Sequence, residues 1–489
     1  MPFTFVRRFR VGRTSLALSV APVILCALGA CSSVGPEFKT PALPLQAEWS
    51  TPAVQRAGVG AENEASFWGS FEDPVLSALL QLALAENLTL KTAAAQVAQA
   101  EAVLRATRAS TLPAAQVSSG SNYSEPDLAS TIRGTNEGST ALQVLGQVSW
   151  EIDFWGRQRR ATEADAASVR STQAAYRAAS VSIKASVAAT YCNVRLFEQR
   201  LAVAQANLAQ QQESLRIAEA RFRLGAASEL DYRQAQTQHA QTLAQLPAIR
   251  QSLASFQHAL SVLVGTPPDR FARGHPMTHA LPSAPKAAAA GLPKDLLRHR
   301  PDVMQAESLA MAQSARIGQA EAALYPSFTL GGSFGFSSIN SVSDLFRWDS
   351  RTLSAGLGLV FPLFDRERIK AQVQVQDSLF RQAVLAYQNQ VLKAQQEVED
   401  AMSAIKEYTE QVAQWRAAEA AASRSAELAA TRYRSGQTDY TTVASAEQAR
   451  LQTADALVQA QGALLQAHIS AWRALGGLEQ DASGRGAQL

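Results

Sequence analysis

The residue with the clearest chemical task is Cys31, a thiol that directly follows a run of small and apolar residues. Residues 28–30 are Leu-Gly-Ala, preceded by four arginines among residues 7–13 and an apolar run over residues 16–28. This basic-then-apolar layout is typical of a secretory signal. Small residues let the chain enter a peptidase cleft, and the cysteine then offers its thiol for attachment of a lipid. We therefore expect a signal peptide at residues 1–30 and lipidation of Cys31.

The Leu-Gly-Ala-Cys sequence resembles a bacterial lipobox, and the alternative is an ordinary signal with an incidental cysteine. The next residue, Ser32, is not aspartate, which in lipoproteins is typical of sorting to the outer membrane. Cys26 lies in the segment that would be removed, so Cys192 would be the only free thiol and an internal disulfide is excluded. The covalent lipid on Cys31 is the only non-protein group that we expect, with no other cofactor.

The remaining polar residues show no constellation for catalysis. His275 and His279 have the spacing of helical metal ligands, but Gly274 and Pro276 indicate a loop. Neither a glycine-rich phosphate loop nor a nucleophile elbow occurs. The formal net charge is only +3, and no basic stripe interleaved with aromatic residues suggests a nucleic-acid partner. We expect a protein that is not an enzyme and has no metal site.

Similar sequence features recur in the two halves of the chain at an offset of roughly 210 residues. Residues 87–90 (Asn-Leu-Thr-Leu) and 300–303 (Arg-Pro-Asp-Val) each open a helical pattern. Residues 221–225 (Arg-Phe-Arg-Leu-Gly) are echoed by residues 432–436 (Arg-Tyr-Arg-Ser-Gly). These features predict a duplication. The predicted segments are a signal peptide at 1–30, a lipidated amino-terminal and equatorial region at 31–85, a first repeat at 86–285, a second repeat at 286–476 and a tail at 477–489.

The longest helical pattern in each repeat carries an apolar residue at every seventh position. In the first repeat these residues are Val187, Val194, Leu201, Leu208, Leu215 and Phe222, and in the second Val384, Val391, Val398, Ile405 and Val412. A heptad pattern keeps one face of a helix against its neighbours over a great length. Each pattern ends at a glycine, Gly225 or Gly436, that can adopt a left-handed conformation before a shorter return helix. Each repeat should therefore contain a helical hairpin, the first return helix being interrupted and bent at Pro247.

Apolar and polar residues alternate in the segments that precede these helices. The alternation covers residues 142–154, 328–336 and 353–361, and residues 115–123 are expected to form a fourth strand mainly by symmetry. A half-buried sheet on a soluble core would give the same pattern. Four strands cannot close a barrel, however, and an open sheet edge cannot lie in lipid. Insertion into a membrane would therefore require several subunits to pool their strands.

Six short motifs resemble those of one family when they are taken together and in order. They are residues 34–38 (Val-Gly-Pro-Glu-Phe), 150–157 (Trp-Glu-Ile-Asp-Phe-Trp-Gly-Arg), 297–303 (Leu-Arg-His-Arg-Pro-Asp-Val), 325–327 (Tyr-Pro-Ser), 361–365 (Phe-Pro-Leu-Phe-Asp) and 474–477 (Ala-Leu-Gly-Gly). The chain thus resembles the TolC/OprM-like outer-membrane efflux channels, and more closely the lipoprotein (NodT-type) branch of the outer membrane factor family. The resemblance covers nearly the whole mature chain.

The resemblance implies a mainly α fold with a β-barrel part. It implies a homotrimer in which the duplicated strand-and-hairpin plan forms a twelve-stranded outer-membrane β-barrel, continued by a long periplasmic α-helical barrel. The implied function is a passive, gated exit duct of a tripartite efflux system for drugs or other toxic small molecules. The implied partners are a periplasmic adaptor (membrane fusion) protein, an inner-membrane pump and outer-membrane lipid. A type I protein secretion channel and a structural coiled-coil lipoprotein are the alternatives.

The resemblance also assigns roles to the two hairpin tips. The residues implied to contact the adaptor are Leu224, Gly225, Ala226, Ala227 and Ser228 in the first tip and Ser435, Gly436, Gln437 and Thr438 in the second.

A periplasmic gate is implied beside these tips. Tyr433 and Asp231 match a bonded pair that helps to hold the gate shut in relatives. Thr442 and Ser445 stand where relatives carry acidic residues, and Thr438 stands where an arginine is often found. Whether Asp439 or Glu447 substitutes for the missing acidic residues is open from the sequence.

Overall fold

The computed structural model describes residues 33–42, 64–125, 138–268, 281–285, 298–339 and 341–478. The chain forms two compact units. One comprises Met1–Pro41, Ala98–Arg170 and Glu307–Leu385, and the other comprises Ala42–Val97, Ser171–Ala306 and Ala386–Leu489. The first unit contains the sheet together with the beginnings of the long helices, and the second contains the rest of the two helical hairpins.

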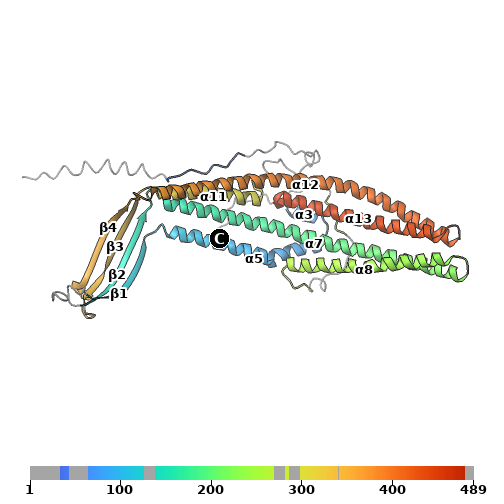
Figure 1. The fold of residues 1–489 in the computed structure, drawn as a ribbon, viewed down its shortest axis with the longest axis horizontal. Coiled ribbons are helices and arrows are strands. Elements are labelled where there is room, and N and C mark those ends of the chain that lie inside the picture. Colours follow the sequence, from blue (N-terminus) through green and yellow to red (C-terminus); the bar gives the residue numbers. More distant parts are fainter. Residues whose placement is uncertain are drawn as a thin grey trace, which may run out of the picture. The chain divides into compact units, whose positions relative to one another are not determined.

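The sheet is antiparallel, with its four strands in the order β1-β2-β3-β4 (Figure 1). The strands are β1 (Ala114–Ser124), β2 (Ser139–Ile152), β3 (Ser327–Ile339) and β4 (Arg351–Val360), with a 3-10 turn, η1 (Trp348–Ser350), before β4. The two central strands come from different halves of the chain, so the predicted repeats pair with each other. All four predicted strands are present, although Phe154 and Phe361 lie just beyond the ends of β2 and β4.

The strand register gathers the apolar residues on one face of the sheet. Trp150 pairs with Leu330, which pairs with Leu357, and the same alignment joins Ile152, Phe328 and Leu359. Directly opposed residues of antiparallel strands share a face. A shift by one residue would move each of these side chains to the other face. The alternation in the sequence therefore specifies the register.

The opposite face is mainly polar. The Gln116 amide donates to the Gln147 side-chain oxygen at 3.1 Å between β1 and β2. The Ser333 and Ser354 hydroxyls lie 2.8 Å apart on β3 and β4. The sheet thus has one apolar and one polar surface. β1 and β4 are its edge strands, and their side chains are exposed within the single chain.

The helices repeat the same plan twice. The first repeat contains α5 (Leu88–Ala109), α7 (Arg157–Arg223) and α8 (Glu229–Leu263), and the second contains α11 (Pro301–Ala322), α12 (Arg366–Arg434) and α13 (Tyr440–Ala474). Shorter helices are α3 (Glu64–Gly69), α4 (Pro74–Glu86) and the 3-10 turn η2 (Gly476–Leu478). The long helices α7 and α12 have 67 and 69 residues, and both return helices have 35. The matching lengths support the predicted duplication.

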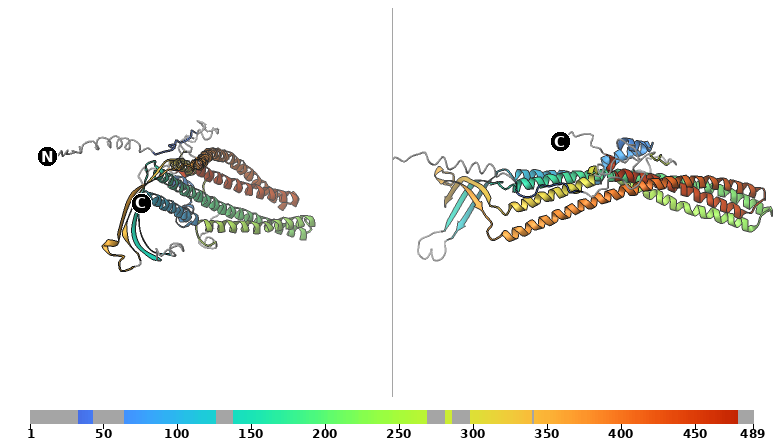
Figure 2. Two further views of the ribbon diagram at one scale, coloured as in Figure 1. Left: turned by 60° about the vertical axis from the view of Figure 1, so that its left-hand side comes forward. Right: turned by 90° about the horizontal axis from the view of Figure 1, so that it is seen from above.

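In the second unit, the parts of the two helical hairpins that it contains lie side by side, with α8 in contact with α13 (Figure 2). Their bases enclose an apolar core in which Trp68 and Trp472 have ring centroids 4.7 Å apart. The heptad residues Val187 and Val194 are buried there, whereas Phe222, at the far end of the stripe, is 38% exposed. Apolar packing is therefore strongest at the hairpin bases and declines towards the tips.

Pro247 lies inside α8, which continues through it, so the predicted interruption of the return helix is wrong, while the predicted bend stays a prediction. Leu246 and Leu253 are buried in the core on either side of this proline. Their packing holds the helix where the proline removes one backbone donor. None of the helices in the described ranges has the length and hydropathy required of a membrane-spanning helix.

Candidate gate and docking site

The two hairpin tips are built from the same backbone turns. Gly225 and Gly436 have φ angles of 69° and 78°. In the first tip the amide of Ala226 donates to the carbonyl of Arg221 at 2.8 Å, and in the second the amide of Gln437 donates to the carbonyl of Arg432 at 2.9 Å. These bonds satisfy the last carbonyls of α7 and α12, as expected of a left-handed helix end.

Each return helix then begins with a side-chain cap. Ser228 accepts a hydrogen bond from the amide of Asp231 at 3.2 Å, and Asp439 accepts one from the amide of Thr442 at 3.1 Å. A capping side chain satisfies an amide that the helix leaves unpaired. The two tips therefore share one capped turn geometry, although their sequences differ.

The predicted adaptor-contact residues lie at the surface of these turns. Leu224 is 83% exposed, and Gly225, Ala226, Ser228, Ser435, Gly436 and Gln437 are exposed as well, while Ala227 and Thr438 are partly exposed. Leu230, in the first turn of α8, is a second exposed apolar residue. The arrangement leaves these side chains accessible, and their role in docking stays a prediction.

Tyr433 lies in a small buried cluster just behind the tips. Its side chain is 2% exposed, and its ring meets that of Tyr440 edge to face at 5.6 Å. Burial, together with the charge of Asp231, raises the pKa of the Tyr433 hydroxyl. In the described part of the chain this hydroxyl has no hydrogen-bond partner. The structure thus brings Tyr433 and Asp231 near each other without the bond that the resemblance implies.

Arg221 is the residue at the tips that sequence reasoning missed. Its guanidinium donates to the backbone carbonyl of Tyr433 and, at 3.2 Å, to that of Ala226, and it lies 4.7 Å from the centroid of the Tyr433 ring. Arg221 therefore connects the last turn of α7 with the last turn of α12. A cation in the last helical turn was a signal for carbonyl binding, but it did not reveal which carbonyl.

The acidic candidates have different surroundings. Hydrogen bonds from Thr442 lower the pKa of Asp439, which is the exposed cap of α13. Glu447 is 4% exposed, accepts from the Ser214 hydroxyl at 2.6 Å, and has a raised pKa because of burial. Thr442 is bonded to Asp439 and Thr438, and Ser445 is exposed. Asp439 therefore caps the first turn of α13, whereas Glu447 lies between the two hairpins.

Cys31 lies outside the described residues. Val34 and Gly35, a few residues later, are hydrogen-bonded to other parts of the first unit. The amide of Val34 donates to the carbonyl of Trp155, and Arg160 donates to the carbonyls of Val34 and Gly35, all at 3.1 Å. A Cβ at Gly156, where φ is 80°, would lie 2.8 Å from Ser33. This glycine of the 150–157 motif therefore allows the amino-terminal segment to approach closely.

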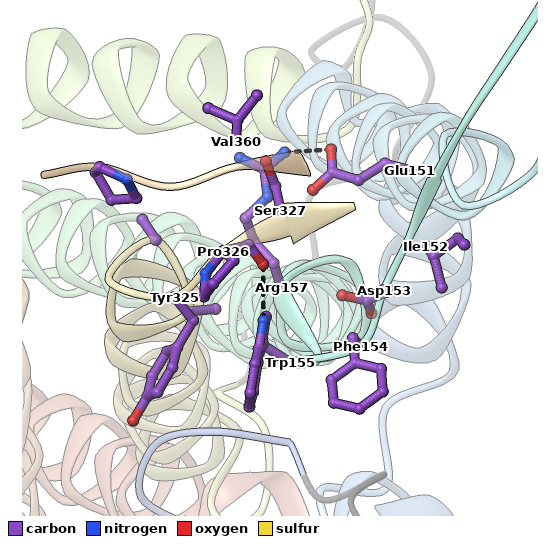
Figure 3. A pocket seen from close by; sticks show the side chains of 13 residues that line it. Glu151, Ile152, Asp153, Phe154, Trp155, Arg157, Tyr325, Pro326, Ser327 and Val360 are labelled. Carbon is purple, nitrogen blue, oxygen red and sulfur yellow. Dashed lines mark hydrogen bonds and ion pairs between the residues drawn. The ribbon is translucent and has the colours of Figure 1, made fainter. Parts of the chain in front are cut away.

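A cavity of about 240 Å³ lies beside this contact, where the strands meet the helices (Figure 3). The Trp155 indole stacks on Tyr325 at 4.6 Å and donates to the carbonyl of Pro326 at 2.8 Å, while Arg157 forms an ion pair with Glu151 at 2.8 Å. The 150–157 motif of the first repeat thus contacts the 325–327 motif of the second. Their aromatic and charged residues form these packing and hydrogen-bond contacts.

The histidine candidates show no site for a metal. His275 and His279 lie outside the described residues. His468 is buried, which lowers its pKa to about 4. Within the ranges that the structure describes, no group of His, Cys, Asp and Glu side chains is placed to hold a metal ion.

The chain matches the family model described as outer membrane efflux protein over residues 79–266 and 292–477. It is 32% identical over 395 residues to nodulation protein T of Rhizobium leguminosarum bv. viciae, covering 80% of this chain and 78% of the relative. It is 31% identical over 478 residues to the pyoverdine export outer membrane protein OpmQ of Pseudomonas putida, covering 94% and 97%.

Solved structures agree with these sequence matches. The outer-membrane channel OprN superposes with a TM-score of 0.83 at 28% identity, covering 91% of this chain and 99% of the channel. The channel CusC superposes with a TM-score of 0.80 at 26% identity, covering 91% and 100%. The chain therefore belongs to the outer membrane efflux protein family, and it is an efflux channel of the outer membrane, as the motifs predicted.

Proposed function

We propose that three copies of this chain form a passive exit duct whose periplasmic end is closed at the hairpin tips. The observation that carries this proposal is the pair of matching tips, each with exposed residues outside and the buried cluster of Tyr433 and Tyr440 behind them. An adaptor that binds the exposed turns would change the packing of this cluster, which lies immediately behind them. Opening would be a population shift driven by different adaptor contacts in the closed and open states.

The same proposal covers the membrane part. The edge strands β1 and β4 would pair with the edges of neighbouring copies, so that the apolar face meets lipid and the polar face lines water. The covalent lipid on Cys31 would add a membrane anchor. An inner-membrane pump and a periplasmic adaptor protein would deliver the substrates.

Small toxic compounds are the substrates that we propose. Relatives of this chain include a pyoverdine export protein and solvent and toluene efflux pump proteins, whose names refer to small molecules. A type I protein secretion channel is the alternative, and selectivity in either case would reside mainly in the pump. Export assays with the cognate pump, comparing a small dye with a secreted polypeptide, distinguish these two uses.

Ion conductance in planar bilayers tests the gate. Purified wild-type trimer should give small, stable steps, and a variant with both Tyr433→Phe and Asp231→Ala should give larger ones, because the gate pair that the family resemblance implies would be absent. A matched control carries Tyr232→Phe and Glu229→Ala on the neighbouring face of α8 and should conduct as the wild type does. Equal conductance steps from all three proteins would show that Tyr433 and Asp231 have no part in closing the gate.

A further inference from the structure

Hydrogen bonds between the two hairpins of one chain follow a seven-residue repeat along α7. Five polar residues of α7, each one position before a residue of the apolar stripe, bond to the second hairpin: Asn193 to Gln466, Arg200 to Asp455, Asn207 to Arg450, Ser214 to Glu447 and Arg221 to the carbonyl of Tyr433. We call this set the inter-hairpin seam. Because heptad positions recur on one helix face, the seam is a continuous polar line beside the apolar stripe.

The strength of the seam varies along its length. Near the bases, Arg200 donates twice to the Asp455 carboxylate, at 2.6 and 3.0 Å, in a bidentate pair. Such pairs are among the stronger hydrogen-bonded contacts. This end of the seam should therefore stay closed when the tips separate.

The middle of the seam is poorly satisfied. Gln211 is fully buried, and in the described chain neither atom of its side-chain amide has a hydrogen-bond partner. One carboxylate oxygen of Glu447 and the side-chain nitrogen of Asn207 also lack partners there. Buried polar groups without partners destabilise the closed hairpins, and water can hydrogen-bond to these groups once the hairpins separate. The middle of the seam therefore favours separation of the hairpins.

Arg221 closes the seam at the tip. Its guanidinium bonds to the carbonyl of Tyr433 at the end of α12 and to that of Ala226 in the turn after α7, and it lies over the Tyr433 ring. Another tip contact between the hairpins is a neutral hydrogen bond from Thr441 to Gln234 at 3.2 Å. A charged donor to helix-end carbonyls is stronger than a neutral bond of this kind.

We propose that Arg221 is the positioning residue that holds the two hairpin tips together, so that breaking its contacts with Tyr433 opens the seam as far as the Arg200–Asp455 pair. This inference rests on the proposed gated-channel function and names the contact that an adaptor must displace. It differs from the Tyr433–Asp231 pair because the acceptor is a backbone carbonyl. Replacing the Tyr433 side chain leaves that acceptor in place.

Single-channel recordings on the purified trimer test the proposal. Arg221→Ala should raise the occupancy of the large-conductance state by about tenfold. The reason is that losing one charge-assisted hydrogen bond shifts a two-state equilibrium by about that factor. Arg221→Lys, which keeps the charge but loses the planar fork, should fall between Arg221→Ala and the wild type. The matched control is Arg223→Ala, whose side chain is 74% exposed and pairs with Glu219 on its own helix, and it should behave as the wild type.

The outcomes separate the inference from the function on which it rests. Wild-type gating in Arg221→Ala, with trimer insertion confirmed, would overturn the role of Arg221 while leaving the channel intact. Equal opening in Arg223→Ala would also overturn it, because loss of positive charge alone would then explain the effect. If Arg221→Ala forms no trimer, Arg221→Lys and Arg221→Gln decide, and wild-type gating in both contradicts the proposal. Absence of conductance from inserted wild-type protein would instead refute the channel function.

Discussion

At the residue scale, buried polar side chains between the hairpins determine how the stability of the protein depends on pH. Glu447 is the clearest case, since burial raises the pKa of its carboxyl while one oxygen has no partner in the described chain. A raised pKa means that the closed hairpins bind the proton more tightly than the separated or unfolded chain does. Stability from this group is therefore greatest below the ordinary pKa of glutamate and falls as pH rises through the folded-state pKa.

Glu447→Gln should remove this pH dependence. The glutamine oxygen can still accept from Ser214, and no buried charge remains, so the variant should be more stable than wild type by about 1 to 3 kcal/mol at neutral pH. The advantage should shrink as pH falls through the raised folded-state pKa of Glu447 towards the ordinary glutamate value of about 4.3. Thermal unfolding of both proteins across this range measures it. An advantage that is constant with pH would show that the charge of Glu447 has no part in stability.

At the scale of elements, the hairpin turns depend on glycine for a conformational reason. Gly225 has a φ angle of 69°, and a Cβ added there would meet nothing within 4 Å. The cost of a side chain is therefore backbone strain alone.

Gly225→Ala should lower the stability of the hairpins by about 1 to 2 kcal/mol, the cost of a left-handed L-residue. Gly436→Ala should cost about the same, because its nearest neighbour, a terminal nitrogen of Arg221, lies at an ordinary 3.5 Å. The control is Gly69→Ala, also free of contacts but without a positive φ, and it should be neutral. Melting of the helical circular dichroism signal measures all three. An unchanged midpoint in Gly225→Ala would mean that the turn relaxes to another conformation.

At the scale of the whole molecule, the two faces of the sheet should respond differently to charge. Leu357 belongs to the apolar row and Ser354 to the polar row of the same strand. Arginine facing lipid costs about 2 to 4 kcal/mol near the middle of a bilayer, whereas arginine facing water costs little.

Leu357→Arg should therefore reduce the fraction of heat-resistant trimer recovered from outer membranes, and Ser354→Arg should insert normally and shift the ion selectivity of the channel. Semi-native gel electrophoresis of membrane fractions gives the first quantity, and reversal potentials give the second. Equal recovery of both variants would contradict the proposed lipid-facing side.

The amino-acid sequence by itself determined the elements and their repetition. Apolar spacing of seven or two, glycines at helix ends and capping residues are local properties, so the long helices, the four strands and the two tips were predictable in order. Pro247 is an exception, because packing of Leu246 and Leu253 outweighs the local effect of a proline. The family motifs likewise located the tips and Tyr433.

Only the tertiary structure decided which residues join the hairpins. Arg221 bonds to a carbonyl 212 residues away, and a backbone acceptor carries no signature in the side-chain sequence. The burial of Glu447 likewise depends on which face of α13 meets α7. Helical periodicity specifies that a face is buried, but the partner of that face is set by how long helices pack, which is a property of the folded chain.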